Sequence, residues 1–314
     1  MPGIGITALL PIRNGEKYLP YLKEKLAAIC ATADEILVIS DGSTDKTNLL
    51  ISEWARLDSR VNPIICRSQG LVRTLNLGIS EASHNWIARF DADDTYDLNR
   101  LNLQRKLISE DVSAIFSDYE FQTDSHYKLG LVPSGITPTA VFASLSSGNR
   151  TAHPSVVFNK DKAVACGGYV QDDFRAEDLS LWIRMSALGN LISVPLNLLQ
   201  YTLTKNSITR SSLRGSRQAK EKVLRNYFDR VNLQDFTDNF LMTKQAYTDT
   251  RLGDLRLLLH LRDISRIASE QGSEEQVSKL IWSETRQLIS KVGVDFSIGR
   301  LVVEKILRKI YLAT

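Results

Sequence analysis

Two acidic turns, each directly after a short apolar run, constrain the fold of this chain more than any other feature. The first turn occupies residues 40–45 and follows the run 35–39, and the second occupies residues 91–94 and follows the run 86–90. Apolar runs bounded by turn residues are typical of buried parallel strands, and ligands of open α/β sheets bind beyond the carboxyl ends of such strands. Because crowded carboxylates repel each other, the pattern predicts a hard divalent cation that joins them to the diphosphate of a nucleotide sugar.

The composition excludes several classes of protein. A chain of 314 residues can form one large domain or two smaller ones, and its net charge of +3 is too small to predict binding to nucleic acid. The sequence shows no signal peptide and no apolar run of the roughly 18 residues that a membrane span needs, so we expect a cytoplasmic protein. The cysteines, Cys30, Cys66 and Cys166, are far apart and are expected to be free thiols.

The order of the predicted elements indicates an α/β fold. Apolar runs alternate with amphipathic stretches through the first half of the chain, as in repeated strand–helix units. Strands are expected at 4–10, 35–39, 61–66, 86–90, 113–119 and 155–158, helices at 16–31, 44–57, 71–82, 99–109 and 179–188, an irregular segment at 123–149 and extended chain at 191–201. Beyond residue 211 the periodicity is helical almost throughout.

The first acidic turn combines a structural role with a candidate binding role. Asp, Gly and Ser favour a tight turn followed by a helix, and Ser43 or Thr44 would cap that helix. Capping does not require Asp41, which we expect to accept a hydrogen bond from a nucleobase N–H or a ribose hydroxyl. Asp45 is expected to be structural.

The second turn has an Asp-x-Asp spacing. A solvated acidic turn is the simpler interpretation, but its position at the end of a buried strand, in phase with the first turn, favours a ligand site. Asp91 and Asp93 could place one carboxylate on a ribose and the other on a cation. Oxygen ligands suit Mg²⁺ or Mn²⁺ rather than zinc.

A third acidic element, Glu177-Asp178, comes at the start of a predicted helix. Acidic residues there commonly complement the helix dipole, but an ionised carboxylate near a sugar hydroxyl can also act as a general base. Phosphate loops of other classes are not supported. No Walker A sequence is present, and the pattern at residues 3–8 that fits a dinucleotide loop precedes the first strand instead of following it.

Together these elements resemble the family 2 glycosyltransferases of the GT-A fold. Six motifs appear in the family's order and at similar spacing, at residues 10–16, 40–45, 70–78, 91–94, 153–155 and 177–184. The resemblance implies a GT-A catalytic domain over residues 1–212, with a mainly parallel mixed sheet flanked by helices. It does not cover the last 100 or so residues, and we expect a helical C-terminal region over 213–314.

The resemblance also implies roles for single residues. The nucleotide-sugar side would consist of Pro11, Arg13, Asp41, Arg73, Asp91 and Ala92, with Asp93 as the ligand of the cation. Asp178 would deprotonate the acceptor hydroxyl and Glu177 would orient the acceptor or the base. His153 would contact the metal or an acceptor diphosphate, or else be a structural histidine bonded to backbone. Arg210 would lie on a loop near the diphosphate, and Trp182 is expected in the core.

The implied reaction is an inverting single displacement from a nucleotide-diphosphate sugar, with a UDP-sugar favoured, to a glycan or lipid-linked acceptor in surface-polysaccharide synthesis. Two departures from the family pattern bear on nucleotide preference. Ser40 stands where an aspartate is usual, and Arg13 stands where an aromatic residue is common. The Gln-x-x-Arg-Trp motif and membrane helices of the processive synthases are absent, which favours transfer of one sugar per acceptor visit.

Two other functions remain open from the sequence. One is a sugar-1-phosphate nucleotidyltransferase, although its Gly-rich N-terminal loop is missing. The other is a non-catalytic partner that binds nucleotide sugar or glycan within an assembly complex. The segment 298–312 is basic and amphipathic. Such a helix can lie on an anionic membrane at the inner face, but more often it packs on its own domain or on a second subunit of a homo-oligomer.

Overall fold

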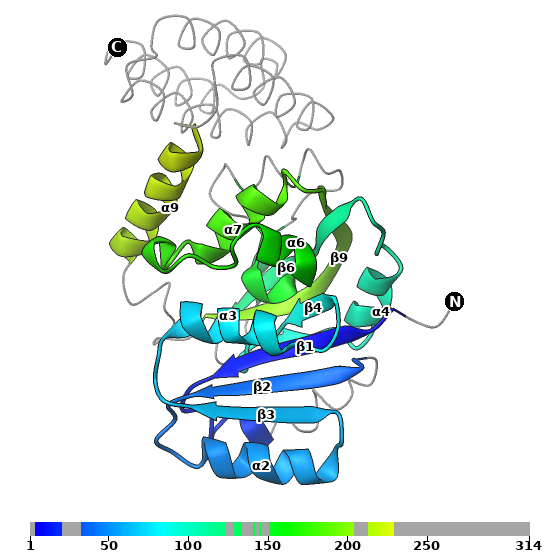
Figure 1. Cartoon of the computed structure of the whole chain (residues 1–314), viewed down its shortest axis with the longest axis vertical. Helices are drawn as coiled ribbons and strands as arrows, with labels where there is room; N and C mark the ends of the chain where they lie inside the picture. Colours follow the sequence, from blue (N-terminus) through cyan, green and yellow to red (C-terminus); the bar gives the residue numbers. More distant parts are fainter. Residues whose placement is uncertain are drawn as a thin grey trace, which may run out of the picture.

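Four parallel strands form the N-terminal half of the sheet, in the order β3-β2-β1-β4. They are β1 (Ile6–Ile12), β2 (Glu35–Asp41), β3 (Val61–Cys66) and β4 (Trp86–Arg89). The computed structural model describes residues 4–20, 33–123, 128–132, 141, 145, 151–203 and 213–228. Because the four strands run in the same direction, their carboxyl ends meet at one edge (Figure 1).

The second half of the sheet is mixed. Short antiparallel β8 (Val157–Asn159) joins β4 to β6 (Val112–Thr123), and β6 pairs in parallel with β9 (Asn190–Leu203). The short strand β5 (Thr95–Tyr96) pairs in antiparallel orientation with β9, and β7 (Lys128–Val132) pairs in the same orientation with β6. The long β6 and β9 therefore connect the parallel half to the turn that follows β4.

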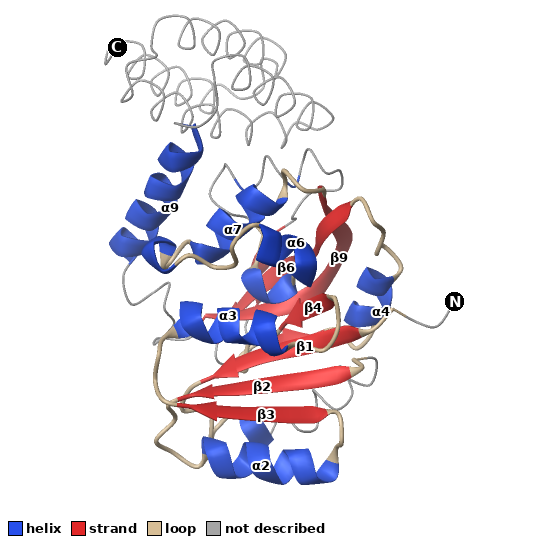
Figure 2. Cartoon of the chain, viewed as in Figure 1, coloured by secondary structure: helices blue, strands red, loops and turns tan. Residues whose placement is uncertain are grey.

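Helices cover both faces of the sheet, and each face has its own apolar core (Figure 2). One core includes side chains of α2 (Thr47–Leu57) and α4 (Arg100–Arg105). The other includes side chains of α3 (Leu71–Glu81), α6 (Lys160–Ala165) and α7 (Glu177–Met185). Alternate residues of β1 supply the two cores, since Leu9 belongs to the second and Ala8 and Leu10 to the first. This two-faced burial explains the continuous apolar runs of the sequence.

Several element boundaries differ from the sequence expectation. The first strand begins and ends two residues later than predicted, and the fourth helix ends at Arg105 instead of 109. The irregular segment 123–149 contains a strand, β7, paired with the end of β6. Two short 3-10 helices were also not predicted, η2 (His153–Ser155) and η3 (Gln171–Asp173). The helix predicted at 16–31 lies mostly outside the described residues.

The capping prediction for α2 was wrong. The helix begins at Thr47, and the residue before it, Lys46, has no side-chain cap. Asp45 supplies the missing acceptor instead, because its Oδ1 accepts the Thr47 N–H at 3.0 Å. Ser43 and Thr44 lie in the preceding turn.

The first helix of the predicted C-terminal region packs on the part of the chain that contains the sheet. In α9 (Leu213–Phe228), Val223 and Leu224 belong to the same apolar core as Trp182 of α7 (Figure 1). The division at residue 212 therefore stays a prediction, and the rest of the region, including the basic segment 298–312, lies outside the described residues. No helix in the described ranges is both long and apolar enough to cross a membrane.

Candidate active site

The loops after β1 and β2 are bonded to each other at the edge where these strands end. Asn14 adopts a φ of 50°, and its Oδ1 accepts the Thr44 N–H at 2.8 Å. The structural role predicted for Asp45 is confirmed, because its carboxylate accepts the N–H groups of Glu16 and Thr47. These contacts fix two of the loops that would surround a nucleotide.

Asp41 lies at the end of β2 and is buried. Its Oδ1 accepts the Gln69 N–H at 2.7 Å and its Oδ2 accepts the Gly70 N–H at 3.1 Å, so it orders the turn that enters α3. A carboxylate has about four acceptor positions, and two remain for a ligand. The nucleobase contact of Asp41 stays a prediction.

The other residues predicted on the nucleotide side differ in exposure. Pro11 is buried within β1, whereas Arg13 is exposed on the following loop and Arg73 is exposed on α3. Ser40, which replaces the usual aspartate, is fully buried, and its Oγ lies 2.8 Å from Ser43 Oγ. Ser40 therefore stabilises the turn, and Arg13 is accessible to a ligand.

The second acidic turn is held by its neighbours in the chain. Arg89, only 3% exposed, donates from Nη2 to Asp91 Oδ1 at 2.7 Å and from Nη1 to the Phe90 carbonyl. The Asp91 N–H donates to the Tyr96 hydroxyl at 2.6 Å. The Asp91 carboxylate is thus fixed in orientation while its side chain remains 31% exposed.

The carboxylates of Asp93 and Asp94 are disfavoured in their charged forms. Burial and the charge of Asp91 raise the pKa of Asp93 to about 6. Burial, followed by the charges of Asp91 and Asp93, raises the pKa of Asp94 well above its usual range. Asp94 Oδ1 accepts the Thr202 N–H at 2.7 Å, but its buried Oδ2 has no hydrogen-bond partner among the described residues.

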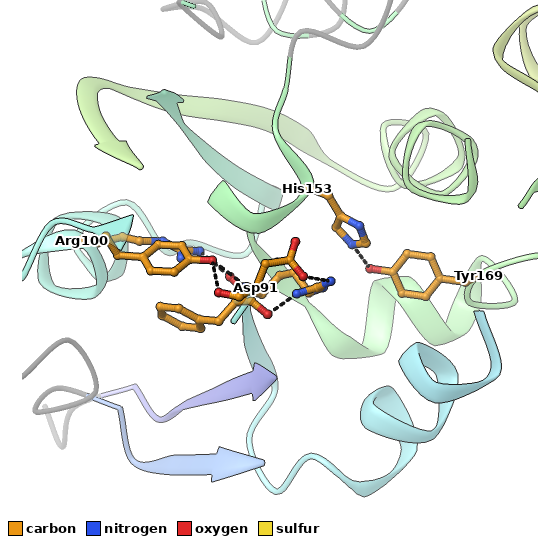
Figure 3. A network of polar contacts seen from close by, with 7 residues as sticks. Asp91, Arg100, His153 and Tyr169 are labelled. Atoms are coloured by element: carbon orange, nitrogen blue, oxygen red, sulfur yellow. Dashed lines mark hydrogen bonds and ion pairs between the residues drawn. The ribbon is translucent and has the colours of Figure 1, made fainter. Parts of the chain in front are cut away.

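A second buried arginine, Arg100 of α4, stabilises the chain next to the acidic turn. Arg100 Nη2 donates to the carbonyls of Arg89 and Val156, each at 3.0 Å, and its guanidinium lies 4.4 Å from the centroid of the Phe90 ring. Figure 3 shows Asp91 between Arg100 on one side and the pair His153 and Tyr169 on the other.

The third acidic element occupies the first turn of α7. The helix begins at Glu177, two residues before the predicted start. Arg175 adopts a φ of 78°, and its N–H donates to Glu177 Oε2 at 2.7 Å. Burial and the charge of Asp178 raise the pKa of Glu177 to about 7. Asp178 is half-buried, and its Oδ1 accepts the Leu179 N–H at 2.7 Å.

Among the described residues, the His153 side chain is hydrogen-bonded to a tyrosine. Its Nε2 lies 2.9 Å from the Tyr169 hydroxyl, and burial and the charge of Arg89 lower the pKa of His153 well below its usual value. Asn76 of α3 holds the Tyr169 backbone through two hydrogen bonds of 2.8 Å. Trp182 is fully buried, as predicted, and packs edge-on against His153.

Arg89 is a functional candidate that the sequence reasoning missed. Its positive charge favours the ionised forms of Asp93, Asp94 and Glu177, lowering the pKa of each against the effect of burial. Arg89 therefore lies within electrostatic reach of both the Asp-x-Asp turn and the start of α7. The signal was present as a single charged residue inside the apolar run that ends in Phe90.

The acidic turn fits a divalent cation that shares its ligands with a substrate. Within the described ranges, no three histidine, cysteine or carboxylate side chains gather to hold a metal by themselves. Mg²⁺ is usually bound by one or two carboxylates together with substrate phosphates. The unpartnered Oδ2 of Asp94 and the crowding around Asp93 suit that arrangement, because a cation would satisfy the oxygen and offset the repulsion.

Comparison with known proteins assigns the family. The model described as Glycosyl transferase family 2 matches residues 7–160, which include the ends of β1, β2 and β4, the Asp-x-Asp turn and His153. The chain belongs to glycosyltransferase family 2. It is an enzyme that transfers a glycosyl group, and the family and the reaction class predicted from the motifs are confirmed.

Two curated bacterial glycosyltransferases are similar to this family 2 enzyme. An amylovoran biosynthesis glycosyltransferase of Erwinia amylovora is 29% identical over 60% of this chain and 71% of its own length. A UDP-Gal:alpha-D-GlcNAc-diphosphoundecaprenol beta-1,3-galactosyltransferase of Escherichia coli is 24% identical over 60% of this chain and 69% of its own length.

Solved structures confirm the GT-A fold of this family 2 enzyme. S. aureus TarS 1-349 in complex with UDP-GlcNAc aligns with a TM-score of 0.61 and 15% identity, covering 98% of this chain and 90% of that one. A mannosyltransferase from Pyrobaculum calidifontis in complex with GDP-Man and Mn²⁺ aligns with a TM-score of 0.55 and 13% identity, covering 99% and 86%. Arg210 lies outside the described residues, and the predicted site roles stay predictions.

Proposed function

We propose that this chain is a metal-dependent, inverting glycosyltransferase that uses a UDP-sugar and glycosylates a glycan or a lipid-linked saccharide during surface-polysaccharide synthesis. One observation carries the proposal. The buried guanidinium of Arg89 interacts electrostatically with two acidic sites, Asp91–Asp94 and Glu177-Asp178. The names of the Escherichia coli and S. aureus proteins support a UDP-sugar donor, and the former supports a lipid-linked acceptor.

In the proposed reaction, the acceptor oxygen attacks the anomeric carbon while the nucleoside diphosphate leaves from the opposite side. Asp178 accepts the proton of the acceptor hydroxyl, and its position at the start of α7 favours the ionised form it needs. Glu177 holds the preceding loop through the Arg175 N–H and thereby orients Asp178. A divalent cation on Asp93 would neutralise charge on the departing diphosphate.

Melting curves with UDP, GDP, dTDP and CMP, each with and without Mn²⁺, test the donor site. A ligand at 100 times its dissociation constant stabilises a protein by about 2.7 kcal/mol, which a melt resolves. We expect UDP to stabilise the wild type only with metal and to have little effect on Asp93→Asn. Stabilisation of the wild type by UDP without metal would contradict the proposed cation.

Turnover tests the reaction itself. With a UDP-sugar and a diphospho-lipid saccharide, we expect Asp178→Asn to bind UDP and Mn²⁺ normally but to lose transfer by a factor of 10² or more. Transfer at the wild-type rate by this variant would refute the role of the base. Formation of UTP from a UDP-sugar and pyrophosphate would instead favour a nucleotidyltransferase.

The membrane association of the enzyme is part of the proposal. Acceptors linked to a lipid reside at the cytoplasmic face of the inner membrane, and the segment 298–312 has the basic, amphipathic character of a surface-binding helix. Removing residues 298–314 should reduce co-sedimentation with anionic liposomes without changing UDP binding. Unchanged co-sedimentation would leave packing on its own domain or on a second subunit as the role of this segment.

A further inference from the structure

The end of β9 contributes one ring to an aromatic cluster that packs against the apolar core near the acidic turn. Tyr201 is half-buried and pairs in register with Phe121 of β6, their ring centroids 5.6 Å apart. Tyr119 lies two residues before Phe121 on the same face, 6.2 Å from the Tyr201 ring. The three rings pack edge-on or tilted, which stabilises such pairs beyond simple burial. The Tyr201 ring is therefore held in place by its neighbours.

Backbone contacts fix this part of β9 against the acidic turn. Gln200 pairs with Thr95, which directly follows the turn, and the Thr202 N–H donates to Asp94 Oδ1 at 2.7 Å. Tyr201 lies between these two contacts in the chain. Its side chain points to the opposite face of the strand from Thr202, whose hydroxyl accepts a hydrogen bond from Gln122 at 3.0 Å.

The surroundings of the Tyr201 hydroxyl are acidic on two sides. Burial, followed by the charges of Asp94, Asp91 and Asp93, raises the pKa of Tyr201 well above its usual value, and Asp178 adds to this effect. The Tyr201 side chain therefore lies within electrostatic reach of both the acidic turn and the start of α7. The hydroxyl stays protonated at working pH, so it can donate a hydrogen bond to a neutral oxygen.

We infer that the Tyr201 hydroxyl donates a hydrogen bond to a hydroxyl oxygen of the transferred sugar and so positions that sugar between the diphosphate and the acceptor. The inference rests on the proposed function. There, a cation on Asp93 would hold the diphosphate, and the donor sugar would lie between this diphosphate and the base Asp178. Tyr201 is a specificity-determining residue in this arrangement, because a hydrogen bond to one hydroxyl distinguishes sugars that differ at that carbon.

Binding of UDP and of UDP-sugars to Tyr201→Phe tests the inference. The probes are UDP, UDP-glucose, UDP-galactose and UDP-N-acetylglucosamine, each with Mn²⁺, measured by calorimetry. We expect Tyr201→Phe to bind UDP as the wild type does and to bind the preferred UDP-sugar about tenfold more weakly, the value of one good hydrogen bond. Retained UDP binding also shows that the variant is folded. Tyr119→Phe removes a hydroxyl from the same ring cluster and should change neither affinity.

Three results would overturn the inference, and they can be told apart from failure of the proposed function. Unchanged affinity for every UDP-sugar would mean that the hydroxyl does not contact the sugar. An equal loss for UDP and UDP-sugar would assign the contact to the diphosphate. Unchanged donor affinity with a raised KM for the acceptor would assign it to the acceptor. If the wild type bound none of the probes, the proposed function would fail first.

Discussion

Replacing Glu177 by glutamine should make the free protein more stable at neutral pH. Glu177 is 6% exposed, and its pKa is raised from 4.5 to about 7. Between pH 4.5 and about 7, the folded state keeps a proton on Glu177 that the unfolded chain has released. Protonation of Glu177 therefore stabilises the folded state at low pH, and this stabilisation is lost as the pH rises through about 7. The difference between the two pKa values corresponds to about 3 kcal/mol of unfolding free energy. Glutamine cannot ionise and keeps the oxygen that accepts the Arg175 N–H.

Urea unfolding at a series of pH values from 4.5 to 8.5 measures this effect. The free energy of unfolding of Glu177→Gln should match the wild type near pH 4.5 and exceed it by about 3 kcal/mol above pH 8. A difference that stays constant with pH would refute the reasoning, because it would show that Glu177 titrates alike in the folded and unfolded states.

Glu35→Gln is the matched control of opposite sign. Glu35 is also buried, but hydrogen bonds from Thr7, Ser83 and Asn62 outweigh burial and lower its pKa. Its contribution to stability is present above the unfolded pKa and is lost as the pH falls through the folded pKa. Glu35→Gln should therefore be less stable than the wild type at neutral pH, and this difference should shrink in acid. Opposite slopes in the two variants exclude a general effect of net charge.

Three further predictions concern packing and the edge of the sheet. Trp182→Ala should cost about 3 to 5 kcal/mol of unfolding free energy, since the ring is fully buried; a loss below 1 kcal/mol would contradict its place in the core. Gly42→Ala should destabilise the protein and weaken UDP binding, because Gly42 has a φ of 65° and a Cβ there would lie 2.5 Å from the Ser68 nitrogen. Gly70→Ala is the control, because Gly70 has a φ of 89° but a Cβ there would meet no atom within 4 Å, so this variant should show the effect of backbone strain alone. Equal UDP affinities of the two variants would argue against a steric effect at Gly42. Asp94→Asn should raise the melting temperature of the free protein while reducing the extra stabilisation by UDP with Mn²⁺; a lower melting temperature would show that the unpartnered carboxylate oxygen does not destabilise the fold.

The parallel half of the sheet could be predicted because β1, β2 and β4 are buried on both faces, which makes their sequences almost continuously apolar. The end of β1 was placed two residues too early, and the strand continues through Pro11 to Ile12. In the structure Pro11 lies beyond Leu9, the last β1 residue in register with β4, so its missing N–H costs no hydrogen bond to that strand. The pairings of β6 with β7 and β9 could not be predicted, because strand partners distant in the sequence are chosen by tertiary packing.

The acidic residues of the site could be found because they stand at the ends of strands and at a helix start. Their partners could not. Arg89 interrupts an apolar run and resembles a surface residue, although its charge is buried beside Asp91. Tyr169 and Tyr201 have no local pattern. Tyr169 matters through its hydrogen bond with His153 and Tyr201 through the charges of the acidic turn, and only the fold brings these groups together.

The hydrogen bond from Thr202 to Asp94 has a consequence for how the enzyme is made. The two residues are 108 positions apart in the sequence, and β5, which follows Asp94, pairs with β9. Chains fold from the N-terminus as they leave the ribosome, so the parallel strands form while the acidic turn still lacks its partner. The turn can close only after residue 202 has emerged. A nascent chain would therefore already contain Asp178 before it could retain a nucleotide sugar, and it would not sequester donor during its own synthesis.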